Sequence, residues 1–104
     1  MSLNFYDRAG GPLTIEQWAM LQEDDEYRQL GLTEVGEARV STIWIGFDLT
    51  VHIFPDFTPK LVQMFETMIF GGPYHLSQWR YFTEEQAIEG HALAVLVAQG
   101  GDEN

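Results

Sequence analysis

The sequence predicts an α+β domain, in which an antiparallel meander sheet of three to four strands packs with an N-terminal and a C-terminal helix. Helix start signals stand near residues 14 and 83, and segments with alternating apolar residues lie between them. Glycine- or proline-containing turns separate these strand-like segments. Because 104 residues suffice to bury one core, we expect a single domain over 1–104, frayed at 1–3 and 100–104.

The first helix is predicted by the stretch "PLTIEQW". Thr14 is placed to cap the helix, and Gln17 stands three residues on, as in a capping box. Leu13 and Trp18 have the spacing of a hydrophobic staple. We expect a helix from about 14 to 22, followed by a second short helical turn in the acidic stretch after it.

The last helix has a similar start signal. Thr83 is the predicted cap, Gln86 stands three residues on, and the two glutamates between them favour the positive end of the helix dipole. We expect this helix to run to about Ala98. Since "ALAVLVA" is apolar nearly all round, the sequence predicts burial on more than one side.

The strands are predicted by alternation and by turn residues. "QLGLTEV" and "ARVSTIWIGFDL" flank Gly36, whose position suits a type II′ hairpin turn. Alternation continues almost to Phe54, so we expect a bend near Gly46 to Asp48. "PDFTP" is the next predicted turn, "KLVQMFETMIF" returns antiparallel, "LNFY" is a short first strand and "QWRYF" is a short edge strand.

A register follows if the "PDFTP" turn pairs Phe54 with Lys60. Residue 48 then faces 66 and residue 44 faces 70, with Ile43, Ile45 and Phe47 on one core face together with Phe65 and Ile69. The opposite face then carries Trp44, Met64, Met68 and Phe70. This second face is either covered by the first helix or exposed as a patch for a partner.

In that register Asp48 and Glu66 are neighbouring carboxylates, which raises one pKa unless a cation lies between them. One interpretation places Arg80 of the edge strand beside Glu66 in a bidentate ion pair. The alternative is a functional carboxylate pair with His52.

The chain is strongly acidic, with 16 Asp and Glu against 5 Lys and Arg and a formal charge of −11. This balance disfavours direct binding to nucleic acid, which requires cationic side chains. It fits either a solvated surface or mimicry of a nucleic-acid backbone. There are no cysteines, no apolar run long enough to cross a membrane and no signal-peptide pattern, so we expect a cytoplasmic protein.

No sequence motif indicates catalysis. The chain lacks a glycine-rich phosphate loop, an HExxH helix and a Gly-x-Ser-x-Gly elbow. We therefore predict no catalytic residues, metal ligands or cofactor, and interpret His91 as a helix-face residue. Tyr74 and Trp79, in and beside the loop after "FETMIFGG", are residue types favoured at binding hot spots.

Four blocks, "FYDRAGGPLTIEQW", "VSTIWIGFD", "FETMIFGG" and "WRYFTEEQAIEGH", together resemble a family of small uncharacterised proteins of bacteriophage and actinobacterial genomes. The resemblance covers most of the chain and implies a phage or prophage origin, without an activity. The chain departs from the family pattern after Asp48, where "LTVHIFPDFTPKLV" replaces an expected histidine and short turn. The motif positions to test first are Trp44, Asp48, Glu66, Gly71, Gly72, Trp79, Arg80 and His91.

Three functional hypotheses follow. The first is a non-catalytic protein-interaction module, or homodimer, that uses the aromatic-rich sheet face or the 71–79 loop. The second is an acidic inhibitor that occupies the nucleic-acid-binding groove of a host or defence protein. The third is a small metal-dependent enzyme that uses Asp48, Glu66 and His52.

Overall fold

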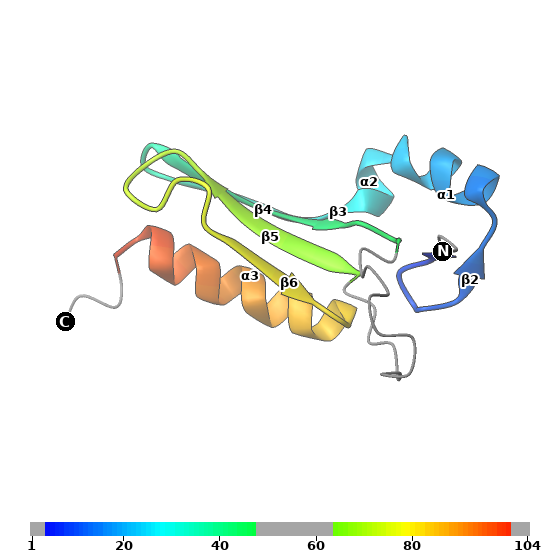
Figure 1. The fold of residues 1–104 in the computed structure, drawn as a ribbon. Coiled ribbons are helices and arrows are strands. Elements are labelled where there is room, and N and C mark those ends of the chain that lie inside the picture. The colour runs from blue at the N-terminus through cyan, green and yellow to red at the C-terminus, as the bar shows by residue number, and fades with distance from the viewer. Residues whose placement is uncertain (1–3, 48–63, 101–104) are drawn as a thin grey trace, which may run out of the picture.

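The computed structural model describes residues 4–47 and 64–100 (Figure 1). Its elements are β1 (Phe5–Tyr6), β2 (Pro12–Leu13), α1 (Ile15–Gln22), α2 (Asp25–Arg28), β3 (Gln29–Val35), β4 (Ala38–Trp44), β5 (Phe65–Phe70), β6 (Gln78–Tyr81) and α3 (Glu84–Ala98). Of the ends predicted to fray, 1–3 and 100–104, all but Gly100 lie outside the described residues, as does the predicted turn at 55–59.

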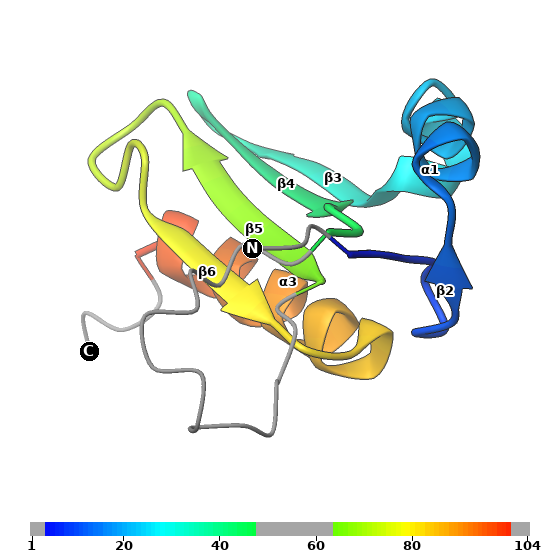
Figure 2. The ribbon, with the colours of Figure 1, turned by 45° about the vertical axis from the view of Figure 1, so that its right-hand side comes forward.

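The main sheet is an antiparallel meander with the strand order β3-β4-β5-β6. Helix α3 packs along one face of this sheet, while α1 and α2 lie at the end where β4 finishes (Figures 1 and 2). β1 and β2 form a separate small hairpin. The predicted α+β class, with its four-stranded meander and its helices at both ends of the chain, is confirmed.

The local signals explain where the elements begin. Thr14 accepts a hydrogen bond from the Gln17 backbone and Gln17 reciprocates, which forms the complete capping box. Thr83 caps α3 in the same way, but the Gln86 side chain accepts from the Phe82 N–H one residue earlier. Gly36 has φ 58°, as the first central residue of the predicted hairpin turn requires.

The predicted register between β4 and β5 is wrong. Trp44 pairs with Phe65 and Ile43 pairs with Glu66, a shift of five residues from the expected pairing. Because five is odd, the faces of β4 exchange: Trp44 points into the core, whereas Ile43 lies on the same face as Glu66. The strand also ends earlier than expected, since Gly46, at φ 77°, turns the chain near the predicted bend.

The core beneath the sheet consists of two clusters. One contains Ala38, Val40, Ile69 and Ala94; the other contains Trp44, Met64, Phe65 and Ala87. The second cluster is extended by side chains of the N-terminal elements, including Trp18, Leu21 and Tyr27. The N-terminal helices therefore close one end of the core and do not form a layer of their own.

Helix α3 is not buried on more than one side in the described part of the chain. Its buried residues are small, namely Ala87, Gly90 and Ala94, so the helix lies close to the sheet. Two of its large apolar side chains are exposed to solvent: Leu93 is 63% exposed and Leu96 is 52% exposed. The apolar sequence of this helix thus reflects a close-packed inner stripe and an exposed outer surface.

Candidate functional site

The face of the sheet opposite α3 is the candidate site, and we call it the outer face. Alternation along the four strands selects its members. These are Leu32, Glu34, Arg39, Ser41, Ile43, Glu66, Met68, Phe70, Gln78 and Arg80. The face thus combines apolar, cationic and acidic side chains on hydrogen-bonded strands.

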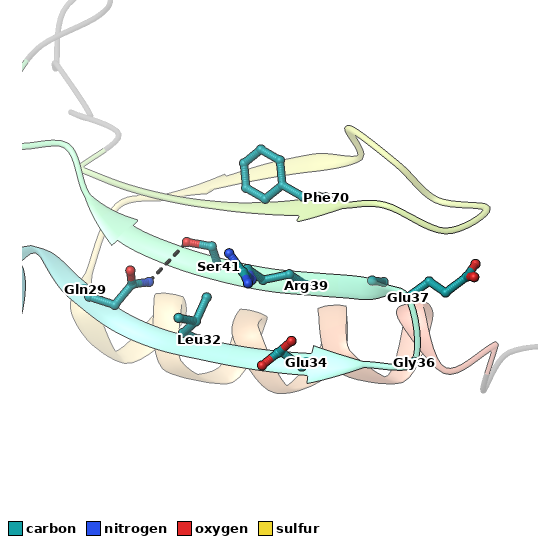
Figure 3. Close-up of a pocket in the computed structure, with 9 residues that line it drawn as sticks. Gln29, Leu32, Glu34, Gly36, Glu37, Arg39, Ser41 and Phe70 are labelled. Atoms are coloured by element: carbon teal, nitrogen blue, oxygen red, sulfur yellow. Dashed lines mark hydrogen bonds between the residues drawn. The ribbon is translucent and has the colours of Figure 1, made fainter.

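A hollow of about 530 Å³ lies on this face, over β3, β4 and the end of β5 (Figure 3). Leu32 projects from β3 and is 55% exposed, while Phe70 projects from β5 and is 43% exposed. The other lining residues are Gln29, Glu34, Gly36, Glu37, Ala38, Arg39 and Ser41. Two large apolar side chains therefore flank a polar strand between them.

Gln29 secures one end of the hollow. The pairing of β3 with β4 is irregular between Gln29 and Gly31, which leaves backbone carbonyls to be satisfied. The Gln29 amide donates to the Gly31 carbonyl at 2.6 Å, to the Thr42 carbonyl at 3.1 Å and to Ser41 Oγ at 3.1 Å. The donors of the Gln29 amide are thus used in hydrogen bonds within the sheet and are not available to a ligand.

Arg39 is the cationic group of the hollow. It lies opposite Glu34 on β3 and opposite Phe70 on β5 (Figure 3). Among the described residues, no carboxylate lies within 4.0 Å of its guanidinium. Arg39 is itself exposed, so its guanidinium presents N–H donors at the surface beside the exposed Phe70 ring.

The ion pair between Glu66 and Arg80 that the sequence predicts is present. Arg80 lies opposite Glu66 in the β5–β6 ladder, and its Nε donates to Glu66 Oε2 at 3.0 Å. The second donor is the Gln78 amide, at 2.8 Å, so the interaction is not the expected bidentate fork. A carboxylate in an otherwise apolar strand is thus explained by two neighbours on β6.

The proposed neighbour of Glu66 was Asp48, and this part of the prediction is wrong. The residue opposite Glu66 on β4 is Ile43. Asp48 and His52 lie outside the described residues. Within residues 4–47 and 64–100, no three His, Cys, Asp or Glu side chains gather as a metal site would require.

The predicted interaction residues do not form one surface. Trp44 is fully buried and Met64 is 4% exposed, and both belong to the core cluster against which Trp18 and Leu21 of α1 pack. Cover by the first helix therefore applies to these two residues, while Phe70 is exposed and Met68 is half-buried on the outer face. The expectation that these residues share one surface is wrong because the predicted register pairs Trp44 with Phe70, whereas Trp44 pairs with Phe65.

Tyr74 and Trp79 lie away from the outer face. Tyr74, in the loop after β5, is half-buried against the core cluster around Ile69. Trp79 pairs with Thr67, whose side chain points toward α3, and it lines a groove with Leu93. The Tyr74 and Trp79 side chains thus lie on the α3 side of the sheet.

His91 has a role that the sequence did not indicate. Its Nδ1 lies 2.7 Å from Thr42 Oγ1 and its Nε2 lies 2.9 Å from Thr33 Oγ1. Thr42 is fully buried and also bonds Thr67, so one imidazole joins α3 to three strands. Burial lowers the pKa of His91, because desolvation disfavours the imidazolium.

A second link that the sequence did not indicate joins the N-terminal hairpin to α3. Arg8 donates to both carboxylate oxygens of Glu84, each at 2.7 Å, and a third donor reaches the Tyr27 carbonyl at 3.1 Å. The hydrogen bond raises the pKa of Arg8 and lowers that of Glu84. Arg8 lies in a predicted turn and Glu84 in a predicted helix start, so each residue already had a local explanation. No sequence pattern links two residues that are so far apart in the chain.

The acidic residues of the described chain are divided among several elements. Glu16 lies on α1, and the run Glu23–Glu26 spans the junction of α1 and α2, at one end of the sheet. Glu34 and Glu37 lie at the β3–β4 turn, at the other end (Figure 1). Glu84 and Glu66 are engaged in ion pairs.

Comparisons of the chain with protein-family models, with curated proteins and with solved structures find no match. The resemblance to small phage and actinobacterial proteins stays a prediction. In the described residues, no helix has the length and apolar character needed to cross a membrane.

Proposed function

We propose that this protein is a non-catalytic protein-interaction module that binds a partner protein through the outer face of its sheet. The observation that carries the proposal is the hollow beside Arg39, with Phe70 and Leu32 exposed at its sides. Aromatic residues, methionine and arginine are enriched in the buried centres of protein interfaces. Phe70, Met68 and Arg39 provide all three types on adjacent strands.

The sheet also holds these groups in place before a partner arrives. Phe70 and Arg39 are paired residues of one ladder, and Ser41 is tied to Gln29. A paired sheet fixes the backbone from which these side chains project, so binding requires no ordering of the backbone and more of the contact energy appears as affinity. This supports a binding surface rather than a flexible loop as the functional part.

The partner chemistry follows from the lining. An apolar side chain would enter between Phe70 and Leu32, and a carboxylate or carbonyl would accept from Arg39. Nucleic-acid mimicry has less support, because the described acids are divided among many elements, from α1 and α2 through the β3–β4 turn and β5 to α3. A phage or prophage origin rests on the sequence resemblance alone.

The test is affinity capture from a lysate of the encoding organism, with quantitative mass spectrometry at near-physiological and at high salt. We expect a partner that survives high salt, is lost with Phe70→Asp and weakens with Arg39→Gln. Leu96→Asp is the matched control, since Leu96 is exposed on α3 and that variant should retain the partner.

Two results would contradict the proposal. One is a partner whose capture is the same with Phe70→Asp as with the unmodified chain. The other is a nucleic-acid-binding protein captured only at low salt, which would favour mimicry instead. Circular dichroism of each variant checks that the fold is retained.

A further inference from the structure

Strand β6 leaves half of its backbone hydrogen-bonding groups directed away from the sheet. Ile69 N–H donates to the Ser77 carbonyl at 3.0 Å, and on the other side of β5 the Ile45 N–H donates to the Met64 carbonyl at 2.7 Å. The alternation of an antiparallel ladder then points the N–H and C=O groups of Gln78 and Arg80 outward. In the described sheet β6 is an edge strand, and such an edge is a template for a further strand.

Apolar side chains lie beside this edge, on the α3 side of the sheet. Trp79 is 36% exposed and Leu93 of α3 is 63% exposed. They line a groove of about 130 Å³ together with Tyr81, Gly90, Ala94 and Val97. An exposed apolar strip next to a strand edge that has no partner strand in the described sheet is typical of an interface.

The charge pattern indicates what can approach here. The chain carries −11, yet residues 67–83 and 90–100 contain no Asp or Glu. Both the edge strand and the half of α3 beside it come from these acid-free stretches. A second copy, which is equally acidic, meets the least repulsion at this surface.

We propose that two copies of this chain pair through antiparallel β6 strands about a two-fold axis at Trp79. Only the pairings 78–80 and 80–78 place outward-facing residues opposite each other around that axis. A centre at Arg80 would set two arginines directly opposite, which is unfavourable, and a centre at Gln78 would pair Arg80 with Leu76, whose φ of 69° is not extended. In the proposed register Arg80 meets Gln78, and the two Trp79 rings form a cross-strand aromatic pair.

This arrangement joins two four-stranded sheets into one of eight strands. The two-fold axis of an antiparallel strand pair is perpendicular to the sheet, so both outer faces lie on the same side. Two Phe70 hollows are then available to one bivalent partner, which increases avidity without new contacts. The dimer does not depend on the proposed function, because Phe70 is not part of its interface.

The test is sedimentation equilibrium of the whole chain across the micromolar concentration range. We expect a mass twice the 11.9 kDa of the monomer. Gln78→Pro removes an N–H that faces away from β5, so it should weaken the dimer about tenfold or more and leave β5–β6 pairing intact. Gln78→Ala is the matched control: it removes the same side chain, retains the N–H and should leave the dimer within about threefold.

Trp79→Lys provides a second variant, because it sets like charges across the axis and should give a monomer. A chain that is monomeric throughout overturns the proposal. A dimer that is equally stable with Gln78→Pro and Trp79→Lys overturns it too, as does a dimer lost only with Phe70→Asp. That last result would place the interface on the outer face.

Discussion

At the scale of single residues, two glycines determine how closely side chains approach the backbone. A Cβ at Gly31 would lie 2.9 Å from the His91 ring, and a Cβ at Gly46 would overlap the Trp44 ring. Gly46 also has φ 77°, a conformation that side-chain-bearing residues rarely adopt. The absence of a Cβ at these positions therefore lets the His91 ring reach the strands and lets the Trp44 ring pack against the backbone at Gly46.

His91 makes the stability of the protein depend on pH. Its pKa in the folded state is lowered by burial from an ordinary value of 6.5, so the unfolded chain binds the proton more tightly. Stability from the neutral imidazole is fully present above about pH 6.5 and declines as the pH falls through that value. We expect urea unfolding between pH 8 and pH 5.5 to show this decline.

The control for this prediction is His91→Gln, which lacks the titrating group. It should be less stable at pH 8, and its stability should change less between pH 8 and pH 5.5. Equal pH profiles for the two proteins would show that His91 is not the group responsible.

At the scale of elements, the Arg8–Glu84 pair connects the β1–β2 hairpin with the first turn of α3. The guanidinium carbon of Arg8 also lies 5.4 Å from the centroid of the Tyr27 ring. The Tyr27 and Trp44 rings are arranged edge to face, with their centroids 5.0 Å apart. The side chains of the ion pair remain 29% and 37% exposed, so solvent screens part of their attraction. The pair is thus a positioning contact of modest strength between distant segments.

We expect Arg8→Met to lower the free energy of unfolding by about 1 kcal/mol, because the pair is bidentate but partly exposed. A double-mutant cycle with Glu84→Gln isolates the coupling, measured by chemical denaturation at pH 7. Since Arg8 lowers the pKa of Glu84 from its ordinary 4.5, this coupling is present above that pH and is lost as the pH falls further.

Arg28→Met is the control for this cycle. Its ion-pair partner Asp25 has a side chain that is 88% exposed, and the loss of such a pair should change stability by less than about 0.5 kcal/mol. If Arg8→Met and Arg28→Met have the same effect, the Arg8–Glu84 pair does not connect the two segments energetically.

At the scale of the whole molecule, the net charge of −11 acts against compactness. Salt shortens the Debye length from about 30 Å at 0.01 M to about 8 Å at 0.15 M, so it screens this self-repulsion. The ion pairs of the described chain, such as Arg80–Glu66, are few and partly exposed. Screening by salt therefore removes less stabilisation from these pairs than it removes destabilisation from the self-repulsion. We therefore expect the melting temperature to rise as NaCl is added.

Calorimetry on Gln78→Pro checks this expectation, because that variant separates the effect of salt on folding from its effect on dimerisation. KCl at the same ionic strength should give the same shift. A melting temperature that falls with added salt would mean that ion pairing outweighs repulsion.

The sequence by itself determined the elements of this protein. Capping residues such as Thr14 and Thr83, and the glycine at position 36, act over three or four neighbouring residues, so they are readable without a fold. The α+β class follows from the order of these elements. The Glu66–Arg80 pair was also predictable, because a carboxylate among apolar neighbours on a strand is stabilised by a cation on the adjacent strand.

Only the tertiary structure decided the register and the surface. Between Val40 and Phe47 apolar residues stand at both even and odd positions, so the sequence pattern allowed two registers that differ in which face of the strand is buried. The contact of Thr42 with Thr67 and His91, and the turn at Gly46, distinguish the two, and each depends on residues distant in sequence. The outer face therefore contains Phe70 and Arg39, whereas Trp44 is in the core, because long-range contacts and not local alternation orient the strand.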